Sequence, residues 1–249
     1  MKAMVLAAGL GTRLRPLTSD RPKALLEIGG RTLLEITLSR LQEFEIREVI
    51  VNVHHFADMI VEYLKINSNF GMRIEVSREE VLLDTGGGLK KAAWFFLESP
   101  SDRDQPFLLH NVDVLSTIDL GRLVQFHAEH RPLATLAVQD RSSSRYLLFN
   151  EQLQLSGRRF ELEQKTEMAR PCQNSRALAF SGVHVISPQL FAMMTEEGSF
   201  SIVDTYLRLA AQGEDLLAFC ADGYYWRDLG TPESLKQAAE DLKHGILRL

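Results

Sequence analysis

The sequence predicts an α/β fold in which parallel strands are joined by crossover helices. Strand-like and helix-like patterns alternate through the first half of the chain, which is typical of strand, helix, strand units. The 249 residues are 45% hydrophobic and 24% charged. This composition supports one buried core and excludes a disordered chain or a small disulfide scaffold. Because no linker-like segment interrupts the pattern, we expect a single domain over residues 1–249.

The first half of the chain supplies the parallel strands. Residues 2–7 form an apolar run that predicts a buried strand, and residues 31–44 place leucines at helical spacing. Residues 48–53 are rich in Val and Ile, which suit a central strand. The same cycle then repeats. We expect a helix over 57–66, a strand over 73–77, a helix over 89–97, a strand over 107–112 and a helix over 120–130.

After Pro132 the pattern changes to strands separated by polar, Gly-containing segments, which favours antiparallel hairpins in the second half. Residues 151–174 mix charges with short apolar stretches, and no element is assigned there. For the rest of this half we expect strands over 134–139, 145–149, 178–186 and 216–220, and helices over 201–212 and 233–247.

The overall charge excludes two classes of partner. Lys and Arg number 28 against 33 Asp and Glu, so the net charge is −5, and we expect no general attraction to nucleic acid or to an anionic membrane. The longest stretch without charged residues, 177–195, contains Ser, Gly, His and Pro, so it is not a membrane span. Cys172 and Cys220 lie far apart without a C-x-x-C, which fits a reducing compartment. We therefore expect a cytoplasmic protein.

The strongest motif is LAAGLGTRLRPLTSDRPKALLEIGG over residues 6–30. A buried strand leads into Gly9 and Gly11, whose missing β-carbons allow backbone N–H groups to approach a phosphate. One cation about 4 Å from a phosphate charge gains about 4 kcal/mol at an effective dielectric of 20, so two or three could hold a triphosphate. The segment is neither a P-loop nor a dinucleotide fingerprint. Its cations are Arg13, Arg15, Arg21 and Lys23.

A second glycine-rich segment, LDTGGG, covers residues 83–88. Three consecutive glycines weaken both helices and strands, so their presence before the helix expected at residue 89 indicates that bare backbone is needed there. A flexible turn is the alternative.

Two acids follow strand-like segments. Asp113 comes directly after residues 107–112, and Asp228 lies in YYWRDLGTP. Residues beyond the carboxyl ends of parallel strands line the ligand crevice, where two carboxylates would bind Mg²⁺ together with phosphate oxygens. The alternative for each is a helix cap or a turn. His127 and His130 have metal-like spacing, but without a Cys or acidic cluster we expect them at the surface.

These segments together resemble the sugar-1-phosphate nucleotidyltransferase family over nearly the whole chain. The resemblance implies a Rossmann-like three-layer sandwich with a mixed, mainly parallel sheet, of the GT-A-like type. It implies a nucleotide-binding half over 1–131 and a sugar-phosphate-binding half over 132–249. The implied reaction is the Mg²⁺-dependent transfer of a nucleoside monophosphate from a nucleoside triphosphate to a sugar 1-phosphate, with release of pyrophosphate.

The resemblance also implies a role for particular residues. Arg13, Lys23 and Asp113 would be catalytic, Gly182 and Asp228 would lie at the sugar phosphate, and Asp113 and Asp228 would bind the metal. The implied nucleotide-binding residues are Ala7, Ala8, Gly9, Gly11, Thr12, Arg13, Lys23, Gly86, Gly87 and Asn111.

The substrates stay open at this point. LDTGGGLKKA is most similar to family members that use N-acetylmuramate-, mannose- or heptose-1-phosphate, and on resemblance alone we favour UTP with an amino-sugar or muramate-type acceptor. Guanylyl transfer is an alternative, as is cytidylyl transfer to phosphocholine, for which Tyr224, Tyr225 and Trp226 could form an aromatic cage. We expect a monomer or a homodimer.

Two departures from the family pattern bear on function. The family has Gly where this chain has Val112, and valine would impair catalysis if that position needs a positive φ. A non-catalytic nucleotide-sugar-binding regulator is therefore a further alternative. The family's Glu-Lys-Pro segment near the sugar has no clear counterpart, because Lys165 in ELEQKTE matches it poorly.

Overall fold

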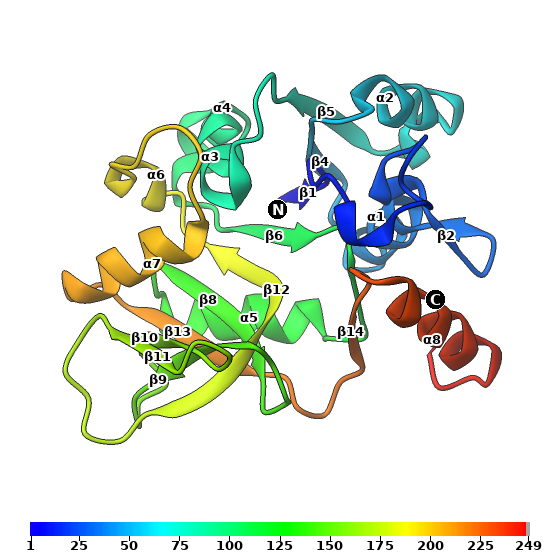
Figure 1. The fold of residues 1–249 in the computed structure, drawn as a ribbon. Coiled ribbons are helices and arrows are strands. Elements are labelled where there is room, and N and C mark those ends of the chain that lie inside the picture. The colour runs from blue at the N-terminus through cyan, green and yellow to red at the C-terminus, as the bar shows by residue number, and fades with distance from the viewer. Residues whose placement is uncertain (248–249) are drawn as a thin grey trace.

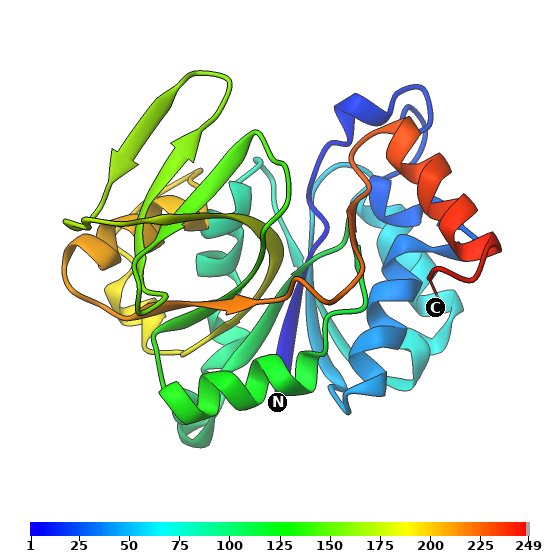
Figure 2. The same cartoon turned by 90° about the horizontal axis from the view of Figure 1, so that it is seen from below.

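A central mixed sheet forms the middle layer of the protein. In this computed structural model residues 1–247 are described, and the strand order is β11-β10-β9-β12-β6-β1-β4-β5. Helices cover both faces of the sheet (Figures 1 and 2), which confirms the predicted α/β class. The strands are β1 (Lys2–Leu6), β2 (Glu27–Ile28), β3 (Arg31–Thr32), β4 (Glu48–Val53), β5 (Arg73–Arg78), β6 (Phe107–Asn111), β7 (Val114–Ser116), β8 (Ala134–Gln139), β9 (Arg145–Phe149), β10 (Leu155–Phe160), β11 (Lys165–Met168), β12 (Arg176–Ile186), β13 (Leu216–Cys220) and β14 (Trp226–Asp228).

The parallel part of the sheet is centred on β1. This strand pairs in parallel with β4 on one side and with β6 on the other, and β5 continues beyond β4. In this register Leu6 lies opposite both Asn52 and Asn111. The carboxyl ends of β1, β4 and β6 therefore meet at one edge, where ligands of open parallel sheets bind.

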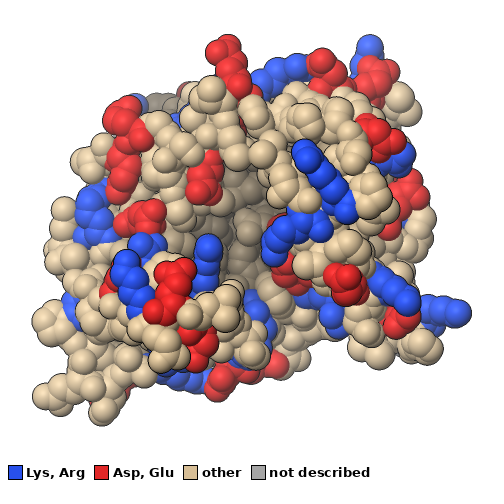
Figure 3. All heavy atoms as spheres, viewed as in Figure 1, with Lys and Arg blue, Asp and Glu red and all other residues tan. Residues whose placement is uncertain are grey.

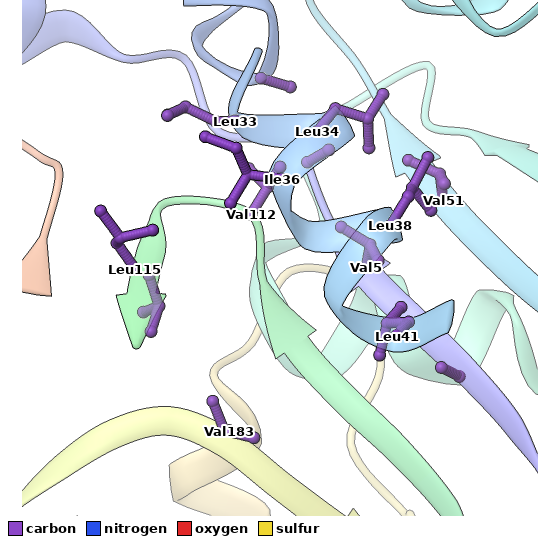
Figure 4. Packing of buried hydrophobic residues seen from close by; sticks show 14 of the residues in the cluster. Val5, Leu33, Leu34, Ile36, Leu38, Leu41, Val51, Val112, Leu115 and Val183 are labelled. Carbon is purple, nitrogen blue, oxygen red and sulfur yellow. The ribbon is translucent and has the colours of Figure 1, made fainter. Parts of the chain in front are cut away.

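Side chains of β1 alternate between two hydrophobic clusters, as the period of a strand requires. Ala3 and Val5 belong to the cluster that includes α1, whereas Met4 belongs to the cluster on the other face. Figure 4 shows Leu34 and Leu38 of α1 beside Val5. No helix within residues 1–247 is both long and apolar enough to cross a membrane. The helices are α1 (Leu33–Glu43), α2 (Ala57–Ile66), α3 (Asp84–Lys91), α4 (Ala93–Phe96), α5 (Leu120–His130), α6 (Leu190–Met193), α7 (Ile202–Ala211) and α8 (Pro232–Lys243).

The second half of the chain is mainly antiparallel and curves around β12. The first residues of β12 pair with β9, its last residues pair with β6, and its register with β8 shifts between Phe180 and His184. Gly182 lies within the shift at φ +70, a conformation that favours glycine. β12 therefore joins the hairpins of the second half to the parallel strands of the first.

A short two-stranded ladder returns the chain to the first half. β14 pairs with β7, and Asp228 lies opposite Val114. The following helix α8 packs beside β2 (Figure 1), and Ala238 is buried in the same cluster as Leu33 of α1.

Most predicted elements agree with the structure, and several agree in their bounds. One prediction is wrong: the helix expected over 89–97 begins at Asp84 as α3, ends at Lys91, and is followed by the separate α4. The helix expected over 31–44 begins at Leu33, because the side chain of Thr32 caps it by accepting from the Glu35 N–H. In the unassigned segment 151–174 the chain forms β10 and β11. The helix expected over 233–247 begins at Pro232 and ends at Lys243 as α8. Residues 248–249 lie outside the described part of the chain.

Candidate active site

The loop that follows β1 is held at both of its ends. The Ala7 N–H donates to Oδ1 of Asn52 (2.7 Å), and Oγ1 of Thr18 donates to the carbonyl of Gly11 (2.8 Å). Gly11 has φ +62, and a β-carbon there would lie 3.0 Å from the Thr18 methyl group, so this turn needs glycine. Gly9 faces open space, since an added β-carbon would meet nothing within 4 Å. The loop therefore presents backbone to the edge of the sheet.

Sequence reasoning missed the buried pair that supports this loop. Asn52, at the end of β4, also donates through Nδ2 to Oε1 of Glu79 (2.7 Å). The second carboxylate oxygen of Glu79 accepts from the Leu83 N–H (3.0 Å). Both side chains are buried, so the pair links the β1 loop to the chain leading into α3. A polar residue inside the apolar run VIVNV was the available signal.

The three consecutive glycines lie inside α3, not before it. A β-carbon on Gly86 would lie 2.9 Å from the Phe200 carbonyl oxygen and also collide with the Phe200 ring, and one on Gly87 would collide with the Gly198 carbonyl. A β-carbon on Gly88 would lie 2.7 Å from Oε1 of Glu79. The Gly86 N–H donates to the Phe200 carbonyl (2.9 Å). Close packing against the 198–200 segment and Glu79 thus explains the glycines, and neither Gly86 nor Gly87 lines the central cleft described below.

Lys23 and Asp113 form an ion pair at the carboxyl end of β6. Lys23 opens a short 3-10 helix (Lys23–Leu25) directly after Pro22, and its side chain is only 9% exposed. A buried ammonium is unfavourable without a partner, so the carboxylate of Asp113 fixes Lys23 at this place.

The β7–β14 ladder brings Asp113 and Asp228 together from positions far apart in the sequence. Asp228 pairs with Val114, and the Leu229 N–H donates to the Asp113 carbonyl (2.8 Å). Oδ1 of Asp228 accepts from the Gly230 N–H (2.9 Å), while Lys23 contacts Oδ2 of Asp113. Within residues 1–247 the other oxygen of each carboxylate has no hydrogen-bond partner, so each remains available to a cation.

Arg13 lies next to Asp228. A β-carbon on Gly230 would lie 2.5 Å from both Nη2 of Arg13 and Oδ1 of Asp228. Both side chains therefore pack against Gly230, which has no β-carbon to keep them away. The other two predicted cations behave differently: Arg21 pairs with Asp20 at the surface (3.1 Å), and Arg15 is exposed. Of the four cations in the signature, the structure therefore brings Arg13 and Lys23 to the aspartates.

Arg13 and Asp228 line a cleft of about 510 Å³, here called the central cleft, whereas Lys23 and Asp113 are not among its lining residues. Figure 3 shows a hollow in this face with basic side chains along its rims. Four residues predicted from the sequence line it: Arg13, Asn111, Gly182 and Asp228. Gly182 lies behind Asn111, because an added β-carbon would lie 2.8 Å from Nδ2 of Asn111.

The opposite wall of the cleft contains arginines that sequence reasoning also missed. They come from the β8–β9 connection and from β9 and β10, and they are Arg141, Arg145, Arg158 and Arg159. All four lie over aromatic rings: Arg141 over Trp226, Arg145 and Arg158 over Phe160, and Arg159 over Tyr146. The second half of the chain thus adds a cationic wall to the phosphate loop of the first half.

The aromatic residues around Asp228 do not form a cage for a quaternary ammonium. Of Tyr224, Tyr225 and Trp226, only Trp226 lines the central cleft. Its ring is covered by Arg141, whose Cζ lies 3.4 Å from the ring centroid, and Tyr225 donates to Asp241 (2.7 Å). Since a cation already occupies the Trp226 ring, these contacts do not favour phosphocholine as the acceptor.

Val112 does not have the positive φ that would make valine unfavourable at this position. It is absent from the residues with positive φ, its N–H donates to the Leu6 carbonyl (3.1 Å), and its side chain is buried beside Ile36 (Figure 4). Valine is therefore compatible with the backbone between β6 and Asp113.

Comparison with known proteins places the chain in a family. A family model described as nucleotidyl transferase matches residues 2–245. The chain is 34% identical over 246 residues to an N-acetylmuramate alpha-1-phosphate uridylyltransferase of Caulobacter vibrioides, covering 96% of this chain and 95% of that protein. It is 31% identical over 248 residues to a mannose-1-phosphate guanylyltransferase of Mycobacterium tuberculosis, covering 98% of this chain and 65% of that protein.

A solved structure has the same fold. HddC from Yersinia pseudotuberculosis, complexed with GMP-PN, superposes with a TM-score of 0.75 at 20% identity, covering 97% of this chain and 99% of that one. The chain therefore belongs to the nucleotidyl transferase family. Within it, the relatives identify the chain as a sugar-1-phosphate nucleotidyltransferase, which confirms the class that the sequence motifs predicted.

Proposed function

We propose that the protein transfers a uridylyl group from UTP to an amino-sugar or muramate-type 1-phosphate, with Mg²⁺ as cofactor. The observation that carries the proposal is that the β7–β14 ladder joins two contact pairs beside the central cleft, Lys23 with Asp113 and Arg13 with Asp228. The 34% identity to an N-acetylmuramate alpha-1-phosphate uridylyltransferase over nearly the full chain supports the choice of UTP and acceptor.

The β1 loop would bind the nucleotide. Its backbone approaches the carboxyl edge of the sheet and is held in place by Asn52 and Thr18, so its N–H groups need little rearrangement to meet phosphate oxygens. Gly86 and Gly87 pack against the protein's own 198–200 segment, so they would act on the nucleotide only by fixing the position of α3. The residues assigned to the nucleotide are Ala7, Ala8, Gly9, Gly11, Thr12, Arg13, Lys23 and Asn111.

The chemistry needs no protein nucleophile. An oxygen of the acceptor phosphate attacks the α-phosphorus of UTP and forms the new P–O bond. The bond from this phosphorus to the bridging oxygen of the β-phosphate breaks, and pyrophosphate leaves with that oxygen. The attacking phosphate is already anionic at neutral pH, so no general base is required. Arg13 and Lys23 would stabilise the phosphate charge that develops, and Gly182 and Asp228 would border the acceptor.

The two aspartates fit Mg²⁺. Each carboxylate keeps one oxygen without a protein partner in the described chain, and Mg²⁺ takes one or two carboxylates plus phosphate oxygens and water. Residues 1–247 contain no group of three or more His, Cys, Asp or Glu that could hold a metal, so the remaining ligands would come from substrate and water. When bound, Mg²⁺ would neutralise charge on the phosphate oxygens.

Pyrophosphate release tests this function. The purified protein is mixed with Mg²⁺, each nucleoside triphosphate and a panel of sugar 1-phosphates. We expect release with UTP and an amino-sugar or muramate-type 1-phosphate, and none when either substrate is omitted. No release with any pair would refute the proposal.

Guanylyl transfer to mannose 1-phosphate is the second candidate. The observation that favours it is the 31% identity to a mannose-1-phosphate guanylyltransferase over 98% of this chain. The same panel separates the two, because GTP with mannose 1-phosphate would then be the best pair.

We further propose that the protein acts in the cytoplasm, since Cys172 and Cys220 are both free thiols, as a reducing compartment favours.

A further inference from the structure

The arginine wall of the central cleft carries more positive charge than a neutral sugar needs. Five arginines line the cleft, and Asp228 is the one acid among the lining residues. Arg158 is neutralised by Glu167 (2.6 Å) and Asp204 (2.5 Å), and Arg159 pairs with Glu161 (3.0 Å). Arg13 lies beside Asp228 at the phosphate end. Within residues 1–247 the lining arginines without a carboxylate partner on the acceptor-facing wall are Arg141 and Arg145.

Arg141 is the arginine of this wall that is best placed to bind a ligand. Nη2 of Arg141 donates to the Phe180 carbonyl (2.9 Å). The guanidinium lies over the Trp226 ring, with Cζ 3.4 Å from the ring centroid. Within residues 1–247 no carboxylate contacts Arg141, and its buried Nε has no hydrogen-bond partner. Burial lowers the pKa of Arg141 to about 10, which still leaves it charged at neutral pH. A buried charge with unused N–H donors is costly unless a ligand pairs with it.

The place of Arg141 separates it from the phosphate end. Trp226, which it covers, precedes Asp228 by two residues on β14, so the two side chains lie on one face of the strand about 6.6 Å apart. That spacing is comparable to the width of a pyranose ring. A sugar whose 1-phosphate lies at Asp228 and Lys23 would therefore bring a ring substituent, not the phosphate, towards Arg141.

We propose that the acceptor carries a carboxylate on its sugar ring in addition to the 1-phosphate, and that Arg141 binds this carboxylate. The guanidinium fork matches a carboxylate in geometry, and its contacts to Phe180 and Trp226 hold it ready for the ligand. This inference rests on the proposed transfer to a sugar 1-phosphate and narrows its acceptor to acidic sugars. It sets the chain apart from enzymes of the family that act on neutral sugars such as mannose.

The test compares two acceptors that differ in this one group. N-acetylmuramate 1-phosphate carries a lactyl carboxylate on O3, whereas N-acetylglucosamine 1-phosphate does not. For the wild-type protein with Mg²⁺ and UTP, we expect kcat/KM to favour the carboxylated acceptor by about 10- to 100-fold, the effect of one charge-assisted contact. Arg141→Gln, which keeps an amide donor, should lower kcat/KM for the carboxylated acceptor by about 10- to 100-fold more than for the uncarboxylated one, and so remove this preference.

A matched arginine controls for general effects of charge. Arg47 is exposed at the amino end of β4, the opposite edge of the sheet, and Arg47→Gln should leave the preference intact. Urea unfolding of both variants checks that neither is destabilised enough to explain a loss. An equal loss on both acceptors in Arg141→Gln would overturn the proposal, because Arg141 would then contact the shared phosphate. A wild-type preference for the uncarboxylated acceptor would also overturn it.

Calorimetric binding of the same two acceptors separates this inference from the proposed function. If no pair of substrates releases pyrophosphate, the proposed function fails. Tighter binding of N-acetylmuramate 1-phosphate, lost in Arg141→Gln, would still support carboxylate recognition. Equal dissociation constants for the two acceptors would refute it whether or not turnover is seen.

Discussion

At the scale of single residues, the site depends on a few buried polar groups that satisfy one another. Lys23 is held by Asp113, and Asn52 joins the Ala7 N–H to Glu79. Each contact leaves a buried donor or acceptor unpaired if one partner is removed, and the cost of that loss exceeds the net value of the bond itself. The two pairs therefore act both on stability and on the geometry of the β1 loop.

Asn52→Leu tests the second pair. The change leaves the Ala7 N–H and one oxygen of Glu79 without a partner, each at a cost of about 1 to 3 kcal/mol. We expect the free energy of unfolding in urea to fall by about 2 kcal/mol or more, and the KM for the nucleotide to rise more than the KM for the acceptor.

Asn174→Leu is the matched control, because Asn174 is exposed and makes one long hydrogen bond to Glu151 (3.4 Å). Its effect on stability should stay within about 0.5 kcal/mol. An Asn52→Leu protein as stable as this control, with unchanged nucleotide KM, would contradict the role assigned to the pair.

At the scale of elements, α3 is determined by packing and not by helix propensity. Alanine would favour an isolated helix over glycine by about 1 kcal/mol, yet β-carbons on Gly86 and Gly87 would collide with the segment before α7. The sequence indicated that bare backbone was needed, but it could not show that the neighbour was the protein's own 198–200 segment, more than a hundred residues further along the chain. For this reason the start of the helix was predicted five residues too late.

Gly87→Ala should therefore destabilise the protein in spite of its higher helix propensity. The new β-carbon would meet a backbone carbonyl, that of Gly198, which cannot rotate away. We expect a loss of about 1 to 3 kcal/mol, the usual cost of overpacking, measured by thermal or urea unfolding.

Gly223→Ala provides the comparison, since a β-carbon there would meet nothing within 4 Å and its φ is not positive. It should change stability by less than about 0.5 kcal/mol. If Gly87→Ala proved as stable as Gly223→Ala or more so, the packing explanation for the glycines would be wrong.

At the scale of the whole molecule, the sequence revealed the parallel strands but not every contact between distant segments. The apolar runs of β1, β4 and β6 and the acid after β6 predicted which edge of the sheet forms the site. The pairing of β7 with β14 could not be predicted, because each strand has three residues and too little periodicity to recognise. The arginines of β9 and β10 were missed for a related reason, since their common wall exists only after β12 bends.

The folded core also buries histidines in their neutral form. Burial lowers the pKa of His110 and His127 to about 4, and burial together with the nearby His110 lowers that of His184 to about 3. His127, expected at the surface, instead lies within 2.9 Å of Thr135 Oγ1. The histidines take up protons near pH 6.5 only in the unfolded chain, so the unfolded state binds more protons between pH 6.5 and 4.

Stability should therefore be greatest above about pH 6.5 and fall as the pH drops towards 4, by about 1.4 kcal/mol per pH unit for each histidine. Urea unfolding at pH 7.5, 6 and 5 measures this slope. His127→Gln should reduce the slope by the contribution of one histidine, about 1.4 kcal/mol per pH unit. A stability that stays constant from pH 7 to pH 5 would show that these side chains are not held neutral.

We propose that Asp113 and Asp228 form one metal site at the phosphate end of the central cleft. The most direct test is Mg²⁺-dependent pyrophosphate release by Asp113→Asn, Asp228→Asn and the double variant. Asparagine keeps an acceptor for Lys23 and for the Gly230 N–H, so folding should be retained, and Asp222→Asn, at a surface acceptor for the Asp140 N–H, is the control. We expect each site variant to lose on the order of 100-fold or more in turnover and the control to keep full activity. A double variant that folds and turns over like the wild type would contradict the claim.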